Sequence, residues 1–208
     1  MVPYNNVASD YLQTRYFDDA VDANVAMSIP DVLAMFLIPA MGYFVDKLGR
    51  KVSLMALGSI CFIAGHLLLT IGRGKCLAVS ALIILGFGYS TLLAFWACVP
   101  TLVRNIRHSA AYGVLTSACN LSVTLISLIV APLVAHDPTF RLCGFFFSLL
   151  AFCSLILVAL LSGLNFNRRL GLDQSDSTLT AEGDATSTLQ ASITGASASQ
   201  GICHEHFH

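Results

Sequence analysis

The chain has 208 residues, of which 56% are hydrophobic and 11% are charged. Soluble proteins carry about 25% charged residues, and a mean hydropathy of +0.74 is too high for a surface that faces water, so the composition excludes a soluble domain. The net charge of −1 gives no basic excess for binding nucleic acid. The composition predicts an all-α, multi-pass membrane protein that lies in the lipid bilayer.

The seven cysteines predict neither a disulfide framework nor a metal site. Their number is odd, and no two have the spacing of a zinc-binding pair. We therefore expect no metal and no cofactor. No nucleophile–base pair and no phosphate-binding glycine loop stands out, so we do not expect an enzyme.

Five stretches are apolar and long enough to cross a bilayer, which takes roughly 20 residues of helix. Asp31 interrupts the first stretch and His66 lies in the second, whereas the other three are free of charge. Short connections make neighbouring helices antiparallel. The five predicted spans are residues 24–45, 52–72, 76–103, 109–135 and 142–167.

The chain is predicted to divide into three parts. Residues 1–23 form the end of a preceding helix and an outer or luminal segment, 24–164 the five-helix transmembrane part, and 165–208 a tail. The tail is rich in serine, threonine, alanine and glycine without apolar periodicity, so we expect it to be disordered. Its tip carries Cys203 and three histidines, but a short flexible segment has no scaffold to fix metal ligands.

The distribution of lysine and arginine predicts the orientation, because cytoplasmic loops carry an excess of both. One side of the predicted bundle collects seven basic residues and the other collects four. The larger set is Lys47, Arg50, Lys51, Arg104, Arg107, Arg168 and Arg169, and the smaller set is Arg15, Arg73, Lys75 and Arg141. The side with the larger set, including the C-terminal tail, is predicted to be cytoplasmic.

The most specific motif of the chain lies between the first two spans, at residues 42–51 (GYFVDKLGRK). It matches the pattern G-x-x-x-D-[RK]-x-G-R-[RK] at every defined position, and by this motif the chain resembles the major facilitator superfamily. We interpret the matching residues as a gating motif. They are Gly42, Asp46, Lys47, Gly49, Arg50 and Lys51.

The resemblance implies part of a twelve-helix transporter fold. The five spans would be helices eight to twelve, residues 2–4 would be the outer end of helix seven, and Met1 would begin a fragment or an incomplete gene model. Residues 85–90 (LGFGYS) and 110–113 (AAYG) are similar to the lysosomal dipeptide uniporters of the superfamily.

That similarity implies transport of dipeptides or amino-acid-like solutes by alternating access across the lysosomal membrane. It also implies an accessory lysosomal membrane glycoprotein as a partner. Two alternatives stay open at this point. One is a major facilitator transporter for another solute, such as a sugar or a monocarboxylate, and the other is a non-transporting membrane fragment or interaction module.

The loop motif has a physical interpretation of its own. Gly49 permits the left-handed backbone of a tight turn. Asp46 lies at the negative C-terminal end of its helix, where an anion is disfavoured, so we expect it to contact Arg50, Arg104 or the N-terminal end of the fourth span near Ser109. Such a contact would break and re-form as the cytoplasmic side opens and closes. Alternatively, the basic residues of the loop only set the orientation.

Four residues within the spans are candidates for binding the solute. Tyr89 and Trp96 are seven residues apart and so share a helical face. Asn120 lies in mid-span and should point into the bundle. Asp31 could bind a substrate amine or couple transport to protons. For the two aromatic residues the alternative is packing, and for Asn120 it is a hydrogen bond to a neighbouring helix.

Two further features of the spans are expected to be structural. His66 lies on the equivalent of a peripheral helix, and we interpret it as a packed or interfacial histidine. The run Phe145-Phe146-Phe147 is interpreted as surface that faces lipid.

Overall fold

The computed structural model describes residues 2–91, 95–96, 98–99, 103 and 107–168. The predicted disordered tail, apart from residues 165–168, and the histidine-rich tip at 203–208 lie outside the described residues. In the part that is described, the structure is helical. Its helices are α1 (Val2–Arg15), α2 (Ala20–Leu48), α3 (Lys51–Ile71), α4 (Lys75–Ser90), α7 (His108–His136) and α8 (Arg141–Arg168).

Four of the five predicted spans are confirmed as long apolar helices. The helices α2, α3, α7 and α8 are each long and apolar enough to cross a membrane, and their bounds differ by at most four residues from those expected from the sequence. The fifth prediction, residues 76–103, contains α4, which is shorter, and several residues beyond α4 are not described. The fold is an all-α membrane bundle.

The ends of α2 show how the sequence sets these bounds. Asp19 caps its N-terminus by accepting a hydrogen bond from the backbone N–H of Val21. At the other end Gly49 adopts a left-handed backbone with φ 65° and donates its N–H to the carbonyl of Val45, 3.0 Å away. This confirms the tight turn expected at Gly49, which reverses the direction of the chain between α2 and α3.

The helix at the N-terminus extends further than expected. Residues 1–23 were expected to lie outside the bilayer beyond Tyr4, but α1 continues to Arg15 and packs into the bundle. Its buried residues recur at helical spacing, whereas most of the positions between them are polar, so the segment has no apolar run for a hydropathy search to find. The buried set is Tyr4, Ala8, Tyr11 and Leu12.

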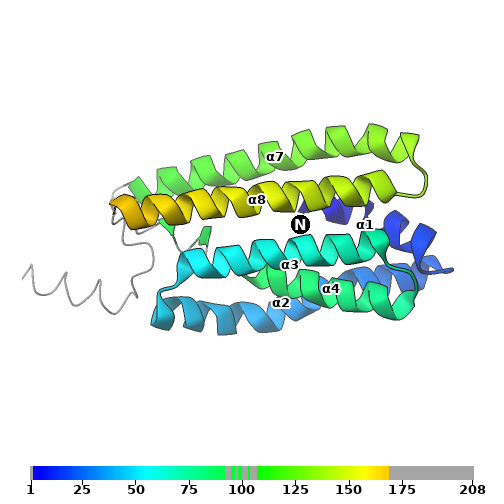
Figure 1. Ribbon diagram of the computed structural model, residues 1–208, viewed down its shortest axis with the longest axis horizontal. Helices are drawn as coiled ribbons and strands as arrows, with labels where there is room; N and C mark the ends of the chain where they lie inside the picture. The colour runs from blue at the N-terminus through cyan, green and yellow to red at the C-terminus, as the bar shows by residue number, and fades with distance from the viewer. Residues whose placement is uncertain (1, 92–94, 97, 100–102, 104–106, 169–208) are drawn as a thin grey trace, which may run out of the picture.

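The helices form one bundle whose core lies between α1, α2, α3, α4 and α8 (Figure 1). Helix α3 packs against α4 and α8, α4 packs against α2, and α1 packs against α2 and α7. Small residues permit the closest approach: a Cβ at Gly86 of α4 would lie 2.9 Å from the Cα of Pro30 in α2. The nearest atom of Pro30 belongs to the backbone. The close packing of α2 against α4 therefore depends on the missing side chain at Gly86.

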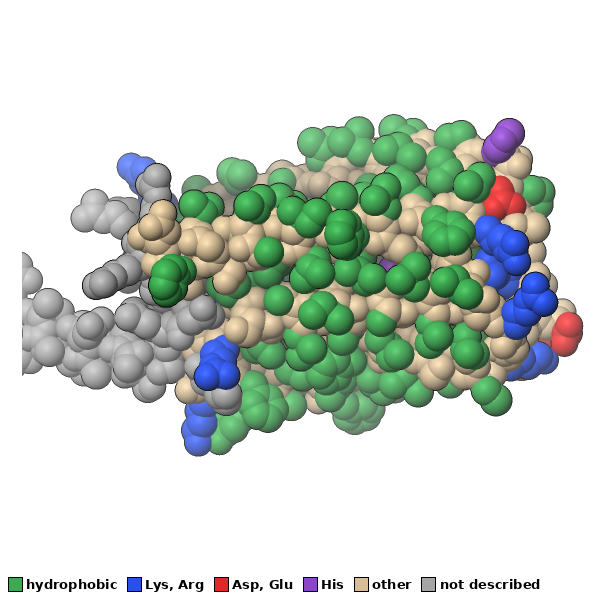
Figure 2. All heavy atoms as spheres, viewed as in Figure 1, with side chains coloured by type: hydrophobic (Ala, Val, Ile, Leu, Met, Phe, Trp, Pro, Cys, Tyr) green, Lys and Arg blue, Asp and Glu red, His purple; other side chains and the backbone are tan. Residues whose placement is uncertain are grey.

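The bundle has two ends, which we name after residues that mark them. The Gly49 end holds the turn between α2 and α3, and the Arg141 end holds the turns that follow α1, α3 and α7. In the view of Figure 2, the flank of the bundle is covered with hydrophobic side chains, Lys and Arg side chains lie at both ends, and acidic side chains are visible at the Arg141 end. This distribution fits a bilayer around the flank with water at both ends.

Candidate functional site

Polar side chains form lengthwise stripes on three helices of the bundle. On α2 they recur at intervals of four and three residues, on α7 likewise, and on α1 at an interval of four, which places each set on one face of its helix. All but the half-buried Ser127 are exposed. We call this set the polar surface: Asn6 and Asp10 of α1, Asn24, Ser28 and Asp31 of α2, and Asn120, Thr124 and Ser127 of α7.

Two hydrogen bonds join the three helices at the polar surface. The amide of Asn6 donates to Ser127 Oγ of α7 at 3.2 Å, and Ser9 Oγ donates to Asn24 Oδ1 of α2 at 2.7 Å. Helix α1 therefore lies between α2 and α7, fixed by one polar contact on each side. In membranes such bonds average only about 0.6 kcal/mol, so they serve to align the stripes more than to stabilise the fold.

The polar surface cannot face lipid at low cost. An ionised aspartate at the centre of a membrane helix costs about 2.5–3.5 kcal/mol on insertion scales, and Asp31 lies within an otherwise apolar stretch of α2. The side chains of Asp31 and Asn120 are both exposed, and among the described residues neither has a hydrogen-bonding side-chain partner. Water or further protein must cover this face in a bilayer.

The structure places Trp96 against Tyr112 at the start of α7. The two rings are stacked, with centroids 6.1 Å apart and an angle of 18° between their planes, and the Tyr112 hydroxyl donates to the Trp96 carbonyl at 3.5 Å. Both side chains are half-buried, as is that of Tyr89. Trp96 therefore packs against α7 and remains partly exposed.

The four candidate residues are not brought together. Within the part of the chain described, no hydrogen bond, ion pair or ring contact joins any two of Tyr89, Trp96, Asn120 and Asp31. Instead, Asp31 and Asn120 each continue a polar stripe. The sequence pattern singles out these two and misses Asn6, Asn24 and Ser127, although the helical spacing of Asn24 from Asp31 and of Ser127 from Asn120 is a usable signal.

The gating motif is exposed at the Gly49 end. Asp46 is exposed and has no ion-pair or hydrogen-bond partner among the described residues, so the expected contact with Arg50 is not formed here. Arg104 lies outside the described residues. Lys47 lies 4.9 Å above the ring of Tyr43, and Lys51 is buried, with 1% of its surface exposed.

The interior of the bundle contains the expected packed histidine. His66 is buried, stacks on Phe147 with centroids 5.4 Å apart, and meets the edge of the Tyr4 ring. This contact corrects the interpretation of the phenylalanine run: Phe145 is exposed but Phe147 is 6% exposed. Successive helical residues point about 100° apart, so three in a row cannot all face lipid.

The described residues offer no obvious place for a metal ion. Within the part of the chain described, no group of three His, Cys, Asp or Glu side chains lies close enough together to hold one. The chemistry available at the polar surface is therefore hydrogen bonding and charge pairing by amide, hydroxyl and carboxylate groups.

Comparisons with known proteins agree with the motif and the fold. The family model of the Major Facilitator Superfamily matches residues 6–188. The curated lysosomal dipeptide transporter MFSD1 of Mus musculus is 26% identical over 172 residues, which cover 79% of this chain and 36% of the relative. The Danio rerio protein of the same name is 26% identical over 178 residues, covering 85% and 38%.

The Homo sapiens protein of that name is 24% identical over 164 residues, covering 78% of this chain and 35% of its own length. The chain thus spans little more than a third of the curated relatives that it matches. No solved structure matches the chain significantly. Because the family model covers most of the chain and its signature loop lies between two membrane helices, the protein belongs to the major facilitator superfamily of transporters.

Proposed function

We propose that the protein moves dipeptides or amino-acid-like solutes across the lysosomal membrane by alternating access. The observation that carries this proposal is the polar surface, which runs along α1, α2 and α7 in a chain that is otherwise apolar. We infer that it forms one wall of the solute pathway, opposite a second half of the transporter.

The chemistry of the polar surface suits a zwitterionic peptide. The carboxylate of Asp31 can pair with a substrate ammonium group, and the carboxamide of Asn120 can both donate to and accept from a peptide bond. Tyr89 and Trp96 are half-buried, and aromatic side chains that remain partly exposed can contact an apolar substrate side chain. The dipeptide assignment is supported by the names of the relatives.

We further propose that the Gly49 end faces the cytoplasm, with the tail at residues 165–208 on the same side and the end of α1 on the luminal side. The bias of basic residues supports this orientation. The accessory membrane glycoprotein implied by the resemblance stays a prediction, which co-purification from lysosomal membranes would test.

The test is uptake of labelled dipeptides by proteoliposomes that contain the protein as isolated from its native membranes. We expect saturable uptake that unlabelled dipeptides abolish and that glucose or lactate leave unchanged. Uptake of a sugar or a monocarboxylate in place of dipeptides would overturn the substrate assignment. No uptake of any of these solutes by correctly folded protein would favour a non-transporting membrane protein.

A further inference from the structure

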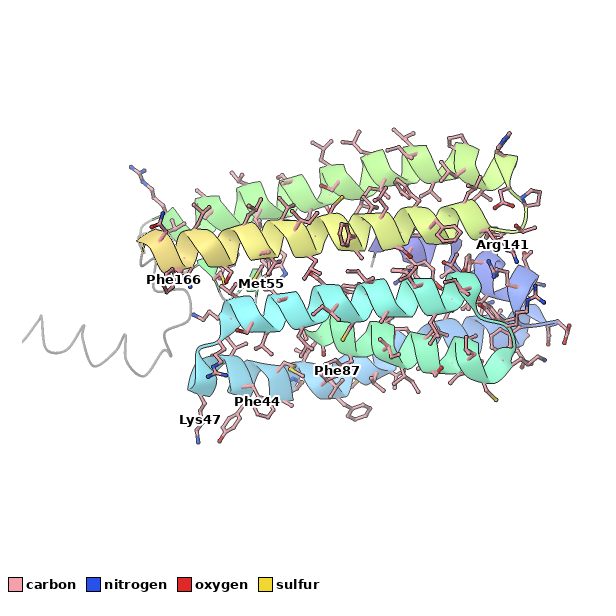
Figure 3. All side chains as sticks on the ribbon, in the orientation of Figure 1. Phe44, Lys47, Met55, Phe87, Arg141 and Phe166 are labelled. Atoms are coloured by element: carbon pink, nitrogen blue, oxygen red, sulfur yellow. The ribbon has the colours of Figure 1, made fainter. Side chains whose placement is uncertain are left out.

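Three arginines that are far apart in the sequence line one cavity at the Arg141 end. The cavity has a volume of about 450 Å³ and is lined by Thr14, Arg15, Gly72, Arg73, Thr139 and Arg141. These residues come from the end of α1, the turn after α3 and the turn before α8. Figure 2 shows Lys and Arg side chains gathered at this end, and Figure 3 labels Arg141 there, at the opposite end from Lys47.

Arg15 is held in a fixed position at this cavity. Its Nη2 donates to the backbone carbonyl of Thr70 at 2.7 Å, and its guanidinium carbon lies 5.6 Å from the ring centroid of Tyr11 and 5.7 Å from that of Tyr16. A guanidinium between two aromatic rings is favourably placed, and the Nη2 bond fixes its direction. Contacts within the protein therefore already hold the Arg15 side chain in place before any ligand binds.

The other terminal nitrogen of Arg15 lacks a partner. Nη1 is buried and has no acceptor, and leaving a buried charged donor unsatisfied is costly. Among the described residues, none of the three arginines forms an ion pair. Three like charges around one cavity repel each other, so an anion in the cavity would remove this repulsion and supply the acceptor that Nη1 lacks.

Three of the acidic residues at this end already have partners of their own. Asp18 pairs with Lys75 at 3.2 Å, and Asp19 caps α2. Asp137 accepts hydrogen bonds from the backbone N–H and hydroxyl of Thr139 and from the N–H of Leu142. These bonds hold the pKa of Asp137 down to about 2, so it stays a hydrogen-bond acceptor for the start of α8. Among the described residues no carboxylate pairs with the three arginines, so an anion from outside the chain can occupy the cavity.

We propose that this cavity binds a phosphate group, either of a phospholipid headgroup or of a soluble phosphate. A guanidinium presents paired donors that match phosphate oxygens. A tetrahedral phosphate has enough oxygens for several such pairs, whereas the planar carboxylate is satisfied by one. The cavity lies where membrane helices end, which is the depth of the lipid headgroups. This inference does not depend on the solute that the protein transports.

The test measures phosphate and phospholipid binding by the 208-residue chain in micelles of a maltoside detergent, which contains no phosphate. One arm titrates labelled inorganic phosphate against the micelles by equilibrium dialysis, with acetate at equal ionic strength as the competitor. The other arm adds phosphatidylglycerol to the micelles and counts the retained anionic lipid by native mass spectrometry. Binding of soluble phosphate identifies a soluble ligand, and retention of phosphatidylglycerol alone identifies a headgroup.

Variants then connect the binding to the cavity. Arg141→Gln and Arg73→Gln change exposed side chains and should each weaken binding about tenfold, the loss expected for one charge-assisted hydrogen bond. Lys75→Gln removes the same charge at the same end without lining the cavity, and should bind like the unmodified chain. Arg15→Lys keeps the charge but loses the paired donors of the guanidinium group, so this variant should also weaken binding.

Three results would overturn the proposal. The first is no binding of either phosphate or phosphatidylglycerol. The second is an equal loss in Lys75→Gln, which would show a general surface charge effect. The third is competition by acetate as strong as that by phosphate. Thermal unfolding of each variant without ligand identifies any that fail to fold, and in that case the remaining arginine variant decides.

Discussion

Asn6 of α1 donates a hydrogen bond of 3.2 Å to Ser127 of α7, although the two residues are 121 positions apart in the sequence. This bond lies on the polar surface and joins a helix that a hydropathy search overlooks to a long apolar span. Together with the bond between Ser9 and Asn24, it places three polar stripes side by side. The transport proposal depends on this alignment.

Asp31→Asn is predicted to weaken dipeptide transport by raising KM about tenfold, because it removes a charge-assisted bond to the substrate ammonium. Asp22→Asn removes a charge from an exposed position of the same helix outside the polar surface and should leave KM unchanged. Uptake by proteoliposomes measures both variants. If Asp31 binds the ammonium, N-acetylated dipeptides should lose less affinity than free dipeptides in the Asp31→Asn variant; an equal loss would contradict this role.

Gly86→Ala is predicted to destabilise the bundle by about 1–3 kcal/mol, the usual cost of inserting a methyl group where none fits. The added Cβ would lie 2.9 Å from Pro30 Cα, and neither backbone can yield independently. Gly113→Ala is the matched control, because nothing lies within 4 Å of its Cβ position and alanine favours helix. Thermal unfolding in detergent compares the two; equal stability would refute the close contact of α2 and α4.

Asp137 is predicted to make stability depend on pH in the acid range. Its pKa is about 2 in the folded protein and 3.8 as a free side chain, so the unfolded chain takes up a proton first as the pH falls. The stabilisation is therefore complete above about pH 4 and is lost as the pH approaches 2. Melting temperatures measured across this range should fall less in Asp137→Asn than in Asp22→Asn; parallel curves would contradict the prediction.

Asp46→Asn is predicted to shift the balance between the inward-open and outward-open states more than it changes solute affinity within either state. The reason is that the proposed contact of Asp46 with the basic residues nearby forms in only one of the two states. Labelling of single cysteines placed at the two ends of the bundle measures the balance. Unchanged labelling at both ends would remove the gating role of Asp46.

The long spans could be predicted from the sequence because each apolar stretch carries its own signal. Helix α1 could not, since its apolar face alternates with Asn5, Asn6, Ser9 and Asp10 and its burial depends on neighbours far along the chain. The same limit applies to the arginine cavity: Arg15, Arg73 and Arg141 meet only because three turns lie at one end of the bundle. Sequence alone placed them on one side but not around one cavity.

The candidate site residues also divide into those that could be predicted from the sequence and those that depend on contacts between distant segments. Asp31 and Asn120 could be found because a polar group in an apolar span is conspicuous by itself. The stacking of Trp96 on Tyr112 depends on how the segment after α4 meets α7, which no local pattern reports. The contacts of Asp46 depend on how distant helices are arranged, so they could not be predicted from the loop motif, and its gating role stays a prediction.

The central claim is that the polar surface lines a water-filled pathway, and cysteine labelling in native membranes tests it most directly. In a background without the native cysteines, Asp31→Cys, Asn120→Cys and Thr124→Cys should react with a charged thiol reagent that cannot cross lipid. Leu149→Cys and Phe152→Cys, on an exposed apolar face of α8, should not react. Equal reactivity of the two sets, or reaction only on α8, would contradict the claim that this surface forms the solute pathway.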